Sequence, residues 1–165
     1  MESVAINKPT LSWRGVWRWC SSWFTPRPVF EILTDGGTLP TRGSKESAGL
    51  DLYCSVRQVV IEPYQTGKVP IGISCSFNPG WAAFIWDRSG MGSKGYHRFA
   101  GLIDSDYRGE WGVIIHNTTS ERLVIGQYDR VAQVVFQRCW IGRASHGVVK
   151  NDTVRGSGGF GSTGA

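Results

Sequence analysis

Two aspartates and a tyrosine stand close together in segment 102–109, which has the sequence LIDSDYRG. A positioned carboxylate can orient a water molecule for hydrolysis and accept its proton. In an extended chain Asp104 and Asp106 point to one face and Tyr107 to the other, so periodicity leaves open which aspartate acts. A solvated turn with capping aspartates is equally compatible with this pattern.

A second segment, 87–92 (DRSGMG), combines a guanidinium, a hydroxyl and the backbone amides around a glycine at the end of an expected strand. Arg88, Ser89 and the amide of Gly90 can therefore face one anion. Ordinary turns also contain Arg-Ser-Gly, so the segment alone does not decide between a phosphate site and a turn.

Two polar residues interrupt apolar segments. Gln133 lies in the apolar run 130–136 and needs a hydrogen-bond partner, either structural or a ligand. Asp51 lies at a strand start in 48–52, where its carboxylate can bind backbone amides or a neighbouring arginine.

The segment 155–164 (RGSGGFGSTG) is a glycine-rich arm with one guanidinium and one aromatic ring. Glycines allow backbone amides to converge on phosphate oxygens, Arg155 can pair with a phosphate, and Phe160 offers a face to a base. The alternative is a flexible tail, which is what such composition usually forms. These four segments together indicate a nucleotide site, provided that a scaffold brings them together.

The composition bounds that scaffold. A chain of 165 residues with 41% apolar residues is long enough for one domain with appendages. The net charge of +5 suits nucleic acid, an anionic membrane surface or a triphosphate. Because the arginines cluster in candidate ligand turns and form no extended stripe, we do not expect nucleic-acid binding.

The four cysteines are far apart, without a Cys-x-x-Cys spacing, and only three histidines accompany them. This disfavours a zinc site and favours reduced thiols in a cytosolic protein. The cysteines are Cys20, Cys54, Cys75 and Cys139.

From residue 28 onward, short runs rich in Val, Ile, Phe and Tyr alternate with Gly, Asn, Asp and Pro about every ten residues, which predicts an all-β sandwich or barrel. No helix is expected after residue 27. The predicted strands are Val29–Leu33, Leu50–Val56, Val59–Ile61, Gly67–Ser76, Trp81–Asp87, Gly112–Asn117, Val131–Arg138 and a weaker run near Val148. The predicted organisation is an N-terminal extension (1–27), a β-rich core (28–148) and a C-terminal arm (149–165).

The extension is rich in tryptophan and arginine, and its apolar residues could form one stripe of a short helix. This is compatible with interfacial membrane binding, but partner docking or a misassigned start codon is favoured, because the stripe is short and a glycine interrupts it. Arginines interrupt every apolar run, so neither a transmembrane span nor a secretory signal is expected. We therefore expect a cytoplasmic protein that does not bind membranes, whose extension could still dock a surface or a partner.

Taken in order, five motifs resemble those of the trimeric dUTP pyrophosphatases (dUTPases), particularly viral or phage members. The motifs are 48–52 (AGLDL), 88–92 (RSGMG), 101–109 (GLIDSDYRG), 130–133 (RVAQ) and 155–164 (RGSGGFGSTG). The resemblance implies a jelly-roll-like (β-clip) fold in a homotrimer, with the C-terminal arm of one subunit closing a site that the other two build. It also implies Mg²⁺-dependent hydrolysis of dUTP to dUMP and pyrophosphate, which limits uracil incorporation into DNA and supplies dUMP for dTMP synthesis.

The resemblance also implies roles for individual residues. Asp104 matches the aspartate that holds the attacking water, and Tyr107 matches the tyrosine that leaves no room for a 2′-hydroxyl. Asp51 matches a supporting aspartate. The residues that match substrate contacts are Arg88, Ser89, Gly90 and Gln133 for phosphates, Gly101, Leu102 and Gly112 for the base, and Arg155, Phe160, Gly161 and Ser162 on the arm. Magnesium would be held by substrate phosphates and waters, with no direct protein ligand.

Two departures from the family pattern stand out. Asp87 occupies the position where the family usually has proline, which would free the backbone of the Arg-Ser turn and place a carboxylate near a polyanion. Arg98 and Phe99 stand where some relatives carry an asparagine that recognises the base. Base recognition is therefore expected to depend on main-chain groups.

Two alternative functions remain. A dCTP deaminase with the same fold would lack the arm motif and the Asp-Tyr-Arg-Gly turn. A non-catalytic regulatory or partner-binding protein on a dUTPase scaffold would use the N-terminal extension for docking, although the matched residues argue against lost catalysis.

Overall fold

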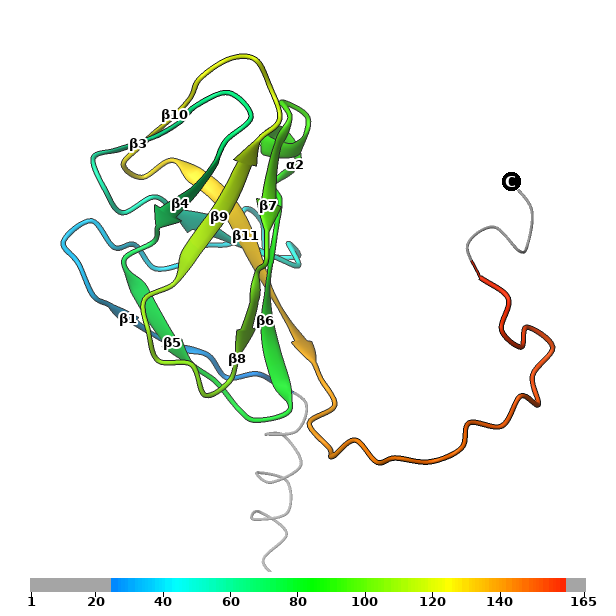
Figure 1. The fold of residues 1–165 in the computed structure, drawn as a ribbon. Helices are drawn as coiled ribbons and strands as arrows, with labels where there is room; N and C mark the ends of the chain where they lie inside the picture. The colour runs from blue at the N-terminus through cyan, green and yellow to red at the C-terminus, as the bar shows by residue number, and fades with distance from the viewer. Residues whose placement is uncertain (1–24, 160–165) are drawn as a thin grey trace, which may run out of the picture.

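The computed structural model describes residues 25–159, which form a β-rich body and a long C-terminal arm (Figure 1). Apart from one short helix, the regular elements in this range are antiparallel strands arranged in four small sheets. The elements are β1 (Val29–Ile32), β2 (Leu50–Tyr53), β3 (Gln58–Ile61), β4 (Thr66–Pro70), β5 (Ile73–Ser76), β6 (Trp81–Trp86), α2 (Ser89–Gly92), β7 (Tyr96–Phe99), β8 (Leu102–Asp104), β9 (Gly112–Asn117), β10 (Leu123–Gly126) and β11 (Arg130–Arg138).

The largest sheet has the strand order β2-β11-β6-β8 and carries most of the candidate site. Gln133, near the middle of β11, pairs with Asp51 of β2 on one side and with Trp86 of β6 on the other. On the far side of β6, Asp104 of β8 pairs with Ala82. Strands far apart in the sequence therefore bring segments of three motifs into one sheet, and a fourth motif follows β6.

The other sheets complete the body. β4-β9-β7 form a three-stranded sheet, and β1-β5 and β3-β10 form two-stranded pairs. Alternate residues along β9 are buried, with Val113, Ile115 and Asn117 facing inward. The largest fully buried side chain is Trp111, against whose ring Phe30 packs edge-on at 5.7 Å.

The predicted fold class is confirmed, and seven of the predicted segments contain strands. The prediction of one strand over Gly67–Ser76 is wrong, because this segment forms β4 and β5 in different sheets. The break contains Gly72, which has φ +71°. A Cβ at Gly72 would lie only 3.0 Å from the Cα of Gly37. A left-handed residue ends the extended chain and redirects it.

Three strands and the helix were not predicted. β7 and β8 have only four and three residues and lie beside candidate site turns, so neither contains a run long enough to indicate a strand. β10 has an apolar sequence, LVIG, and alternates between buried and exposed positions, a signal that could have been found. Helix α2 is a single turn closed on the carbonyl of Arg88, too short to show helical periodicity.

The arm leaves the body directly after β11 and runs away from it (Figure 1). The strand predicted near Val148 is wrong, since residues 139–159 contain no strand and Val148 is 97% exposed. Within residues 25–159, no helix has the length and apolarity needed to cross a membrane.

Candidate active site

A partly buried carboxylate organises two arginines at one end of the large sheet. Asp51 accepts a hydrogen bond from Arg88 Nε to Oδ1 at 2.9 Å and another from Arg130 Nη1 to Oδ2 at 3.3 Å. The Asp51 side chain is only 14% exposed, whereas Arg88 and Arg130 are 27% and 51% exposed. Asp51 therefore positions guanidinium groups that keep part of their surface for a ligand.

Gln133 lies beside this cluster and is held by main-chain contacts. Its Nε2 donates to the carbonyl of Asp87 at 2.8 Å, and a Cβ built at Gly49 would lie 2.4 Å from its Oε1. The glycine at position 49 thus leaves room for the amide. Because a primary amide has two N–H donors, one remains available beyond the bond to Asp87.

A hollow of about 650 Å³ opens beside Arg88 and collects positive charge. Arg88, Arg122, Arg130 and Lys94 line it, together with Gly90 of α2 and one carboxylate, Asp129. Such a lining favours a polyanion. Of these residues, Arg88 and Gly90 were predicted as site residues, and Arg130 lies in the motif 130–133 but had no predicted role.

The expectation that Asp87 loosens the Arg-Ser turn is not what the structure shows. Asp87 Oδ1 accepts the main-chain N–H of Arg98 at 2.8 Å, and Oδ2 contacts Nδ1 of His97. Both carboxylate oxygens are thus engaged by β7. Asp87 ties the turn to the neighbouring strand, in place of the stiffness that a proline would provide.

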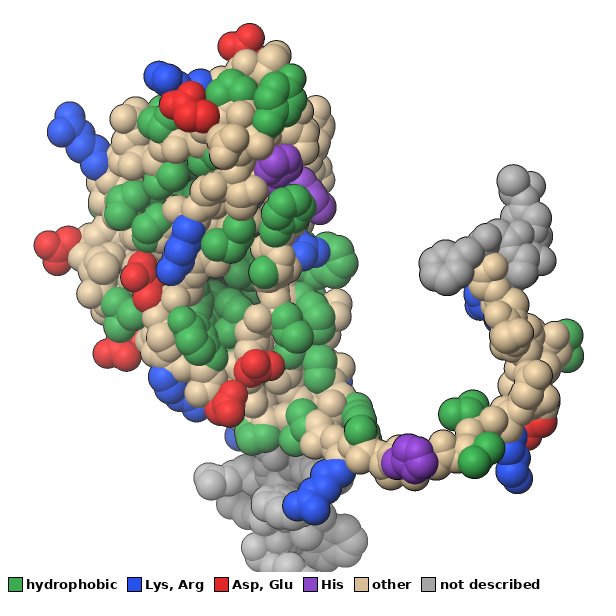
Figure 2. Space-filling model, in the orientation of Figure 1, with side chains coloured by type: hydrophobic (Ala, Val, Ile, Leu, Met, Phe, Trp, Pro, Cys, Tyr) green, Lys and Arg blue, Asp and Glu red, His purple; other side chains and the backbone are tan. Residues whose placement is uncertain are grey.

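Beside Asp87, two histidines lie next to each other on the outer face of β7 and β9. Phe99 stacks on His116 at 5.2 Å and meets His97 edge-on at 5.9 Å. Histidine side chains are grouped on this part of the body in Figure 2.

Asp104 and Tyr107 lie at the other end of the sheet. Asp104 ends β8 with an exposed side chain, and the following turn is closed by a bond from the Tyr107 amide to the Asp104 carbonyl at 3.2 Å. The Tyr107 ring lies over Gly109, where a Cβ would be 2.3 Å from its hydroxyl oxygen, and the hydroxyl donates to the Glu110 carbonyl at 3.2 Å. Gly109 therefore sets the position of the ring, which the sequence pattern had not shown.

The three main-chain positions predicted for the base line one small cavity. Gly101, Leu102 and Gly112 border a space of about 160 Å³. Apolar side chains and backbone form the rest of its wall, contributed by Ile85, Phe99, Ala100, Ile103, Val113 and Ile114. The cavity suits a small flat ring recognised by backbone groups.

The phosphate-type cluster and Asp104 are far apart in one chain. Asp104 pairs with Ala82 near the start of β6, whereas Arg88 follows the end of that strand, six residues after Ala82. At about 3.3 Å per residue, this places the backbones of Arg88 and Asp104 about 20 Å apart. The structure thus brings together Arg88, Asp51 and Gln133, and separately Asp104 and Tyr107, but does not unite the two groups.

Arg155, the predicted arm residue that the structure describes, lies near neither the Arg88 group nor the Asp104 group. Arg155 Nε donates to the Gly158 carbonyl at 3.0 Å within the exposed arm. Phe160, Gly161 and Ser162 lie outside the described residues.

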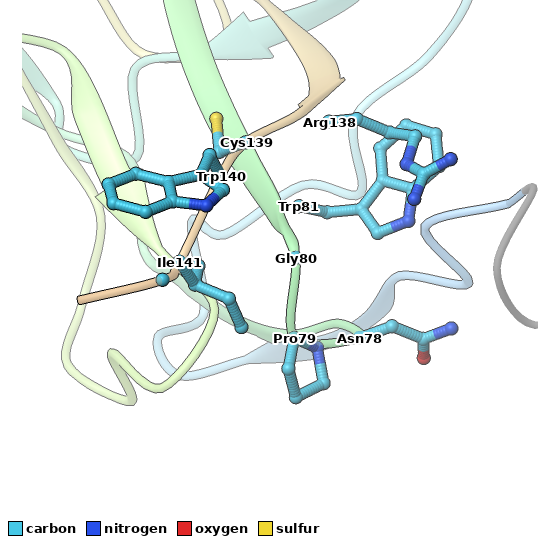
Figure 3. A pocket seen from close by; sticks show the side chains of 9 residues that line it. Asn78, Pro79, Gly80, Trp81, Arg138, Cys139, Trp140 and Ile141 are labelled. Atoms are coloured by element: carbon cyan, nitrogen blue, oxygen red, sulfur yellow. The ribbon is translucent and has the colours of Figure 1, made fainter.

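A larger cavity of about 790 Å³ lies where the arm begins. Residues Asn78–Trp81 and Arg138–Gly142 line it, with Trp140 and Ile141 on one side of Trp81 and Pro79 (Figure 3). It contains none of the residues predicted for the site.

Two of the three described cysteines, Cys54 and Cys75, are buried in the core. Burial raises the pKa of the Cys75 thiol to about 11 and also raises that of Cys54. Both therefore stay protonated near neutral pH, which disfavours metal binding. Within residues 25–159, no group of three or more His, Cys, Asp or Glu side chains is placed to hold a metal ion.

Comparison with known proteins identifies the family to which these motifs belong. The dUTPase family model matches residues 35–164. This chain belongs to the dUTPase family. The match extends from before β2 to the glycine-rich arm, so it covers all five motifs.

Named relatives support the assignment to the dUTPases. The deoxyuridine 5′-triphosphate nucleotidohydrolase of Paramecium bursaria Chlorella virus 1 is 41% identical over 133 residues, covering 80% of this chain and 94% of the viral protein. That of Desulfitobacterium hafniense (strain DSM 10664 / DCB-2) is 43% identical, with 76% and 87% coverage. The human mitochondrial enzyme is 38% identical over 82% of this chain, which spans only 54% of the human protein.

Solved dUTPase structures share the fold. A Staphylococcus bacteriophage 80alpha dUTPase mutant with dUpNHpp has a TM-score of 0.75 and 24% identity, covering 86% of this chain and all of the phage chain. A mutant dUTPase from phage phi11 of S. aureus, described with a structural Mg(II) ion, has a TM-score of 0.69 and 22% identity, covering 76% of this chain and 99% of that one.

Proposed function

We propose that this protein hydrolyses dUTP to dUMP and pyrophosphate. The observation that carries the proposal is the match of residues 35–164 to the dUTPase family, with the predicted residue types present in all five motifs. The basic hollow beside Arg88 and the small cavity at Gly101 fit the two ends of such a substrate.

The reaction requires water to attack the α-phosphorus in line with departing pyrophosphate. Catalysis then depends on positioning and on neutralising phosphate charge. Asp104, exposed at the end of β8, is the carboxylate that orients the water. Because an aspartate is a weak base near neutral pH, it accepts the proton late in the attack.

Phosphate binding falls to the cluster at the start of α2. Arg88 is held by Asp51 and presents its remaining N–H groups to phosphate oxygens. The second N–H of Gln133, the Ser89 hydroxyl and the Gly90 amide add donors. Arg155 of the arm supplies a further guanidinium for the terminal phosphate.

The deoxyribose and the base are recognised by the residues near Asp104, namely Tyr107 and the backbone that borders the small cavity. The Tyr107 ring, held over Gly109, packs against the deoxyribose and excludes a 2′-hydroxyl. The backbone at Gly101, Leu102 and Gly112 hydrogen-bonds uracil in the cavity that they border. Phe160, with Gly161 and Ser162, then covers the base from the arm.

Magnesium fits this arrangement as a companion of the triphosphate. Mg²⁺ prefers phosphate oxygens and waters, so the substrate would hold it without a cluster of protein carboxylates. When bound, it neutralises phosphate charge.

A complete site requires more than one subunit. The separation of about 20 Å between Arg88 and Asp104 far exceeds the reach of two side chains that must act on one phosphate. The phosphate cluster of one subunit therefore meets the Asp104 turn of a neighbour. The arm, with Val148 and Val149 97% and 92% exposed, extends to a third subunit in a homotrimer.

The test is pyrophosphate release from dUTP, dCTP, dTTP and UTP with Mg²⁺, using the full-length protein. We expect selective turnover of dUTP by a trimer, with the mass measured by light scattering. Asp104→Asn should reduce kcat by at least about 10²-fold while leaving the trimer intact. Near-normal turnover of this variant would refute the role of Asp104, and no turnover of any substrate by a folded wild-type trimer would refute the function.

A further inference from the structure

One arginine on β7 has contacts that the proposed mechanism does not use. The guanidinium of Arg98 lies over the Trp86 indole, with Cζ 4.9 Å from the ring centroid, and its Nη1 donates to the carbonyl of Ala100 at 2.6 Å. Its main-chain N–H is bound by Asp87 at 2.8 Å. Both ends of Arg98 are thus held in place.

The carbonyl that Arg98 binds belongs to an unusual turn. Ala100 has φ +58° and Gly101 has φ +99°, so two consecutive residues are in the left-handed region. Such a φ is strained for alanine, which carries a Cβ. The pairing of β7 with β9 ends at Phe99, so the ladder does not hold Ala100 in this conformation.

This turn forms part of the wall of the 160 Å³ cavity. Phe99, Ala100, Gly101 and Leu102 all border it, and a Cβ built at Gly101 would lie 3.5 Å from Arg98 Cδ. The stem of Arg98 therefore lies against the same turn that its guanidinium binds. A shift of Ala100 would move the backbone groups that face the cavity.

The Arg98 side chain is more than a solvated surface cation. Its Nε is buried and has no hydrogen-bond partner among the described residues. Such a donor has lost hydration without full compensation. The contacts of the guanidinium with the Trp86 ring and the Ala100 carbonyl offset this lost hydration. They hold the Arg98 side chain in one position.

We propose that Arg98 is a positioning residue for base recognition: clamped between Trp86 and the Ala100 carbonyl, it holds the left-handed Ala100–Gly101 turn in the shape that accepts uracil. Arg98 acts through the backbone and does not touch the substrate. The inference deepens the proposed dUTP hydrolysis, on which its kinetic consequence rests.

The first test is Arg98→Met, which keeps the aliphatic stem but cannot donate to Ala100. We expect KM for dUTP to rise about tenfold, with kcat little changed. This factor corresponds to the strain of about 1.4 kcal/mol at Ala100 that the Arg98 contacts no longer offset. The preference for dUTP over dCTP should fall in the same variant. Arg57→Met, which changes an exposed arginine elsewhere on the body, is the matched control.

A rescue experiment separates positioning from direct contact. Glycine adopts positive φ without strain, so Ala100→Gly in the Arg98→Met background should restore KM and selectivity. Trp86→Leu removes the other side of the clamp and should show the same defect and the same rescue. Failure of glycine to rescue a folded variant would overturn the inference, because Arg98 would then act on the base directly.

Hydrogen exchange provides a readout that is independent of activity. The amides of Gly101 and Leu102 should exchange faster in Arg98→Met and return toward wild type in the double variant. Unchanged exchange together with unchanged KM would refute the inference, and so would loss of folding in both the Arg98 and the Trp86 variants. Turnover of dUTP by the wild-type protein tests the proposed function separately.

Discussion

The contact between Gly109 and Tyr107 allows a sharp test of how the sugar is selected. In Gly109→Ala, the new Cβ would lie 2.3 Å from the Tyr107 hydroxyl oxygen and 2.6 Å from Cζ. Gly109 is not in the left-handed region, so its backbone accepts alanine without strain. The substitution therefore acts on the ring alone.

The displacement follows from these distances. Ordinary Cβ contact begins at 3.4 Å, so the hydroxyl end of the ring must move by about 1.1 Å from its place. Because Tyr107 is 47% exposed, the ring can swing outward. The lost bond to the Glu110 carbonyl costs about 1 kcal/mol, and replacing glycine offsets part of it through the unfolded chain, so the net change in stability is below about 1 kcal/mol.

The functional effect should be much larger than the effect on stability. A misplacement of about 1 Å in a site can cost about 10²-fold in rate. We expect kcat/KM for dUTP to fall about 10- to 100-fold and the ratio of UTP to dUTP turnover to rise, since the displaced ring no longer blocks the 2′-hydroxyl.

The assay measures pyrophosphate release from dUTP and UTP, together with thermal unfolding. Gly43→Ala is the control, because its Cβ would meet nothing closer than Ser47 Oγ at 3.7 Å. A stable, trimeric Gly109→Ala protein with unchanged kcat/KM and unchanged sugar selectivity would refute the reasoning that Tyr107 selects the sugar through its fixed position.

Two further predictions follow from other contacts. Asp51→Asn should lower kcat/KM for dUTP about tenfold, because a neutral amide replaces the carboxylate charge that holds Arg88 and can no longer accept from both arginines, a loss of about 1.5 kcal/mol. Steady-state kinetics beside the Glu31→Gln control check this, and equal values in both variants would contradict it. Cys75, 2% exposed and with its pKa raised to about 11, should resist iodoacetamide at pH 8 in the folded protein while the more exposed Cys139 reacts. Mass spectrometry of the labelled peptides checks this, and equal labelling of both thiols would show that the core opens.

Local sequence signals were sufficient for the type of most elements and for the chemistry of the motifs. The alternation in β9 predicted its bounds at Gly112–Asn117 correctly, because the two faces of a half-buried strand impose a period of two. The residue types of the Arg88 and Asp104 segments pointed to phosphate binding and hydrolysis. The roles predicted for individual site residues stay predictions until the variants are measured.

Elements that depend on long-range partners could not be predicted in the same way. The segment Gly67–Ser76 was predicted as one strand, but its halves pair with β9 and β1 in different sheets. β8 has only three residues and exists because β6 offers it an edge. Pairing of this kind is a property of the partner strand, which local periodicity does not contain.

The sequence by itself determined the all-β class and the set of reactive groups, because burial of alternate residues and the chemistry of side chains are local properties. Only the tertiary structure decided where those groups lie. It placed Asp51 between Arg88 and Arg130, engaged the Asp87 carboxylate with β7, and put Asp104 beside the start of β6 and Arg88 just beyond its end. These outcomes follow from strand order and register, which are set by contacts between residues far apart in the chain.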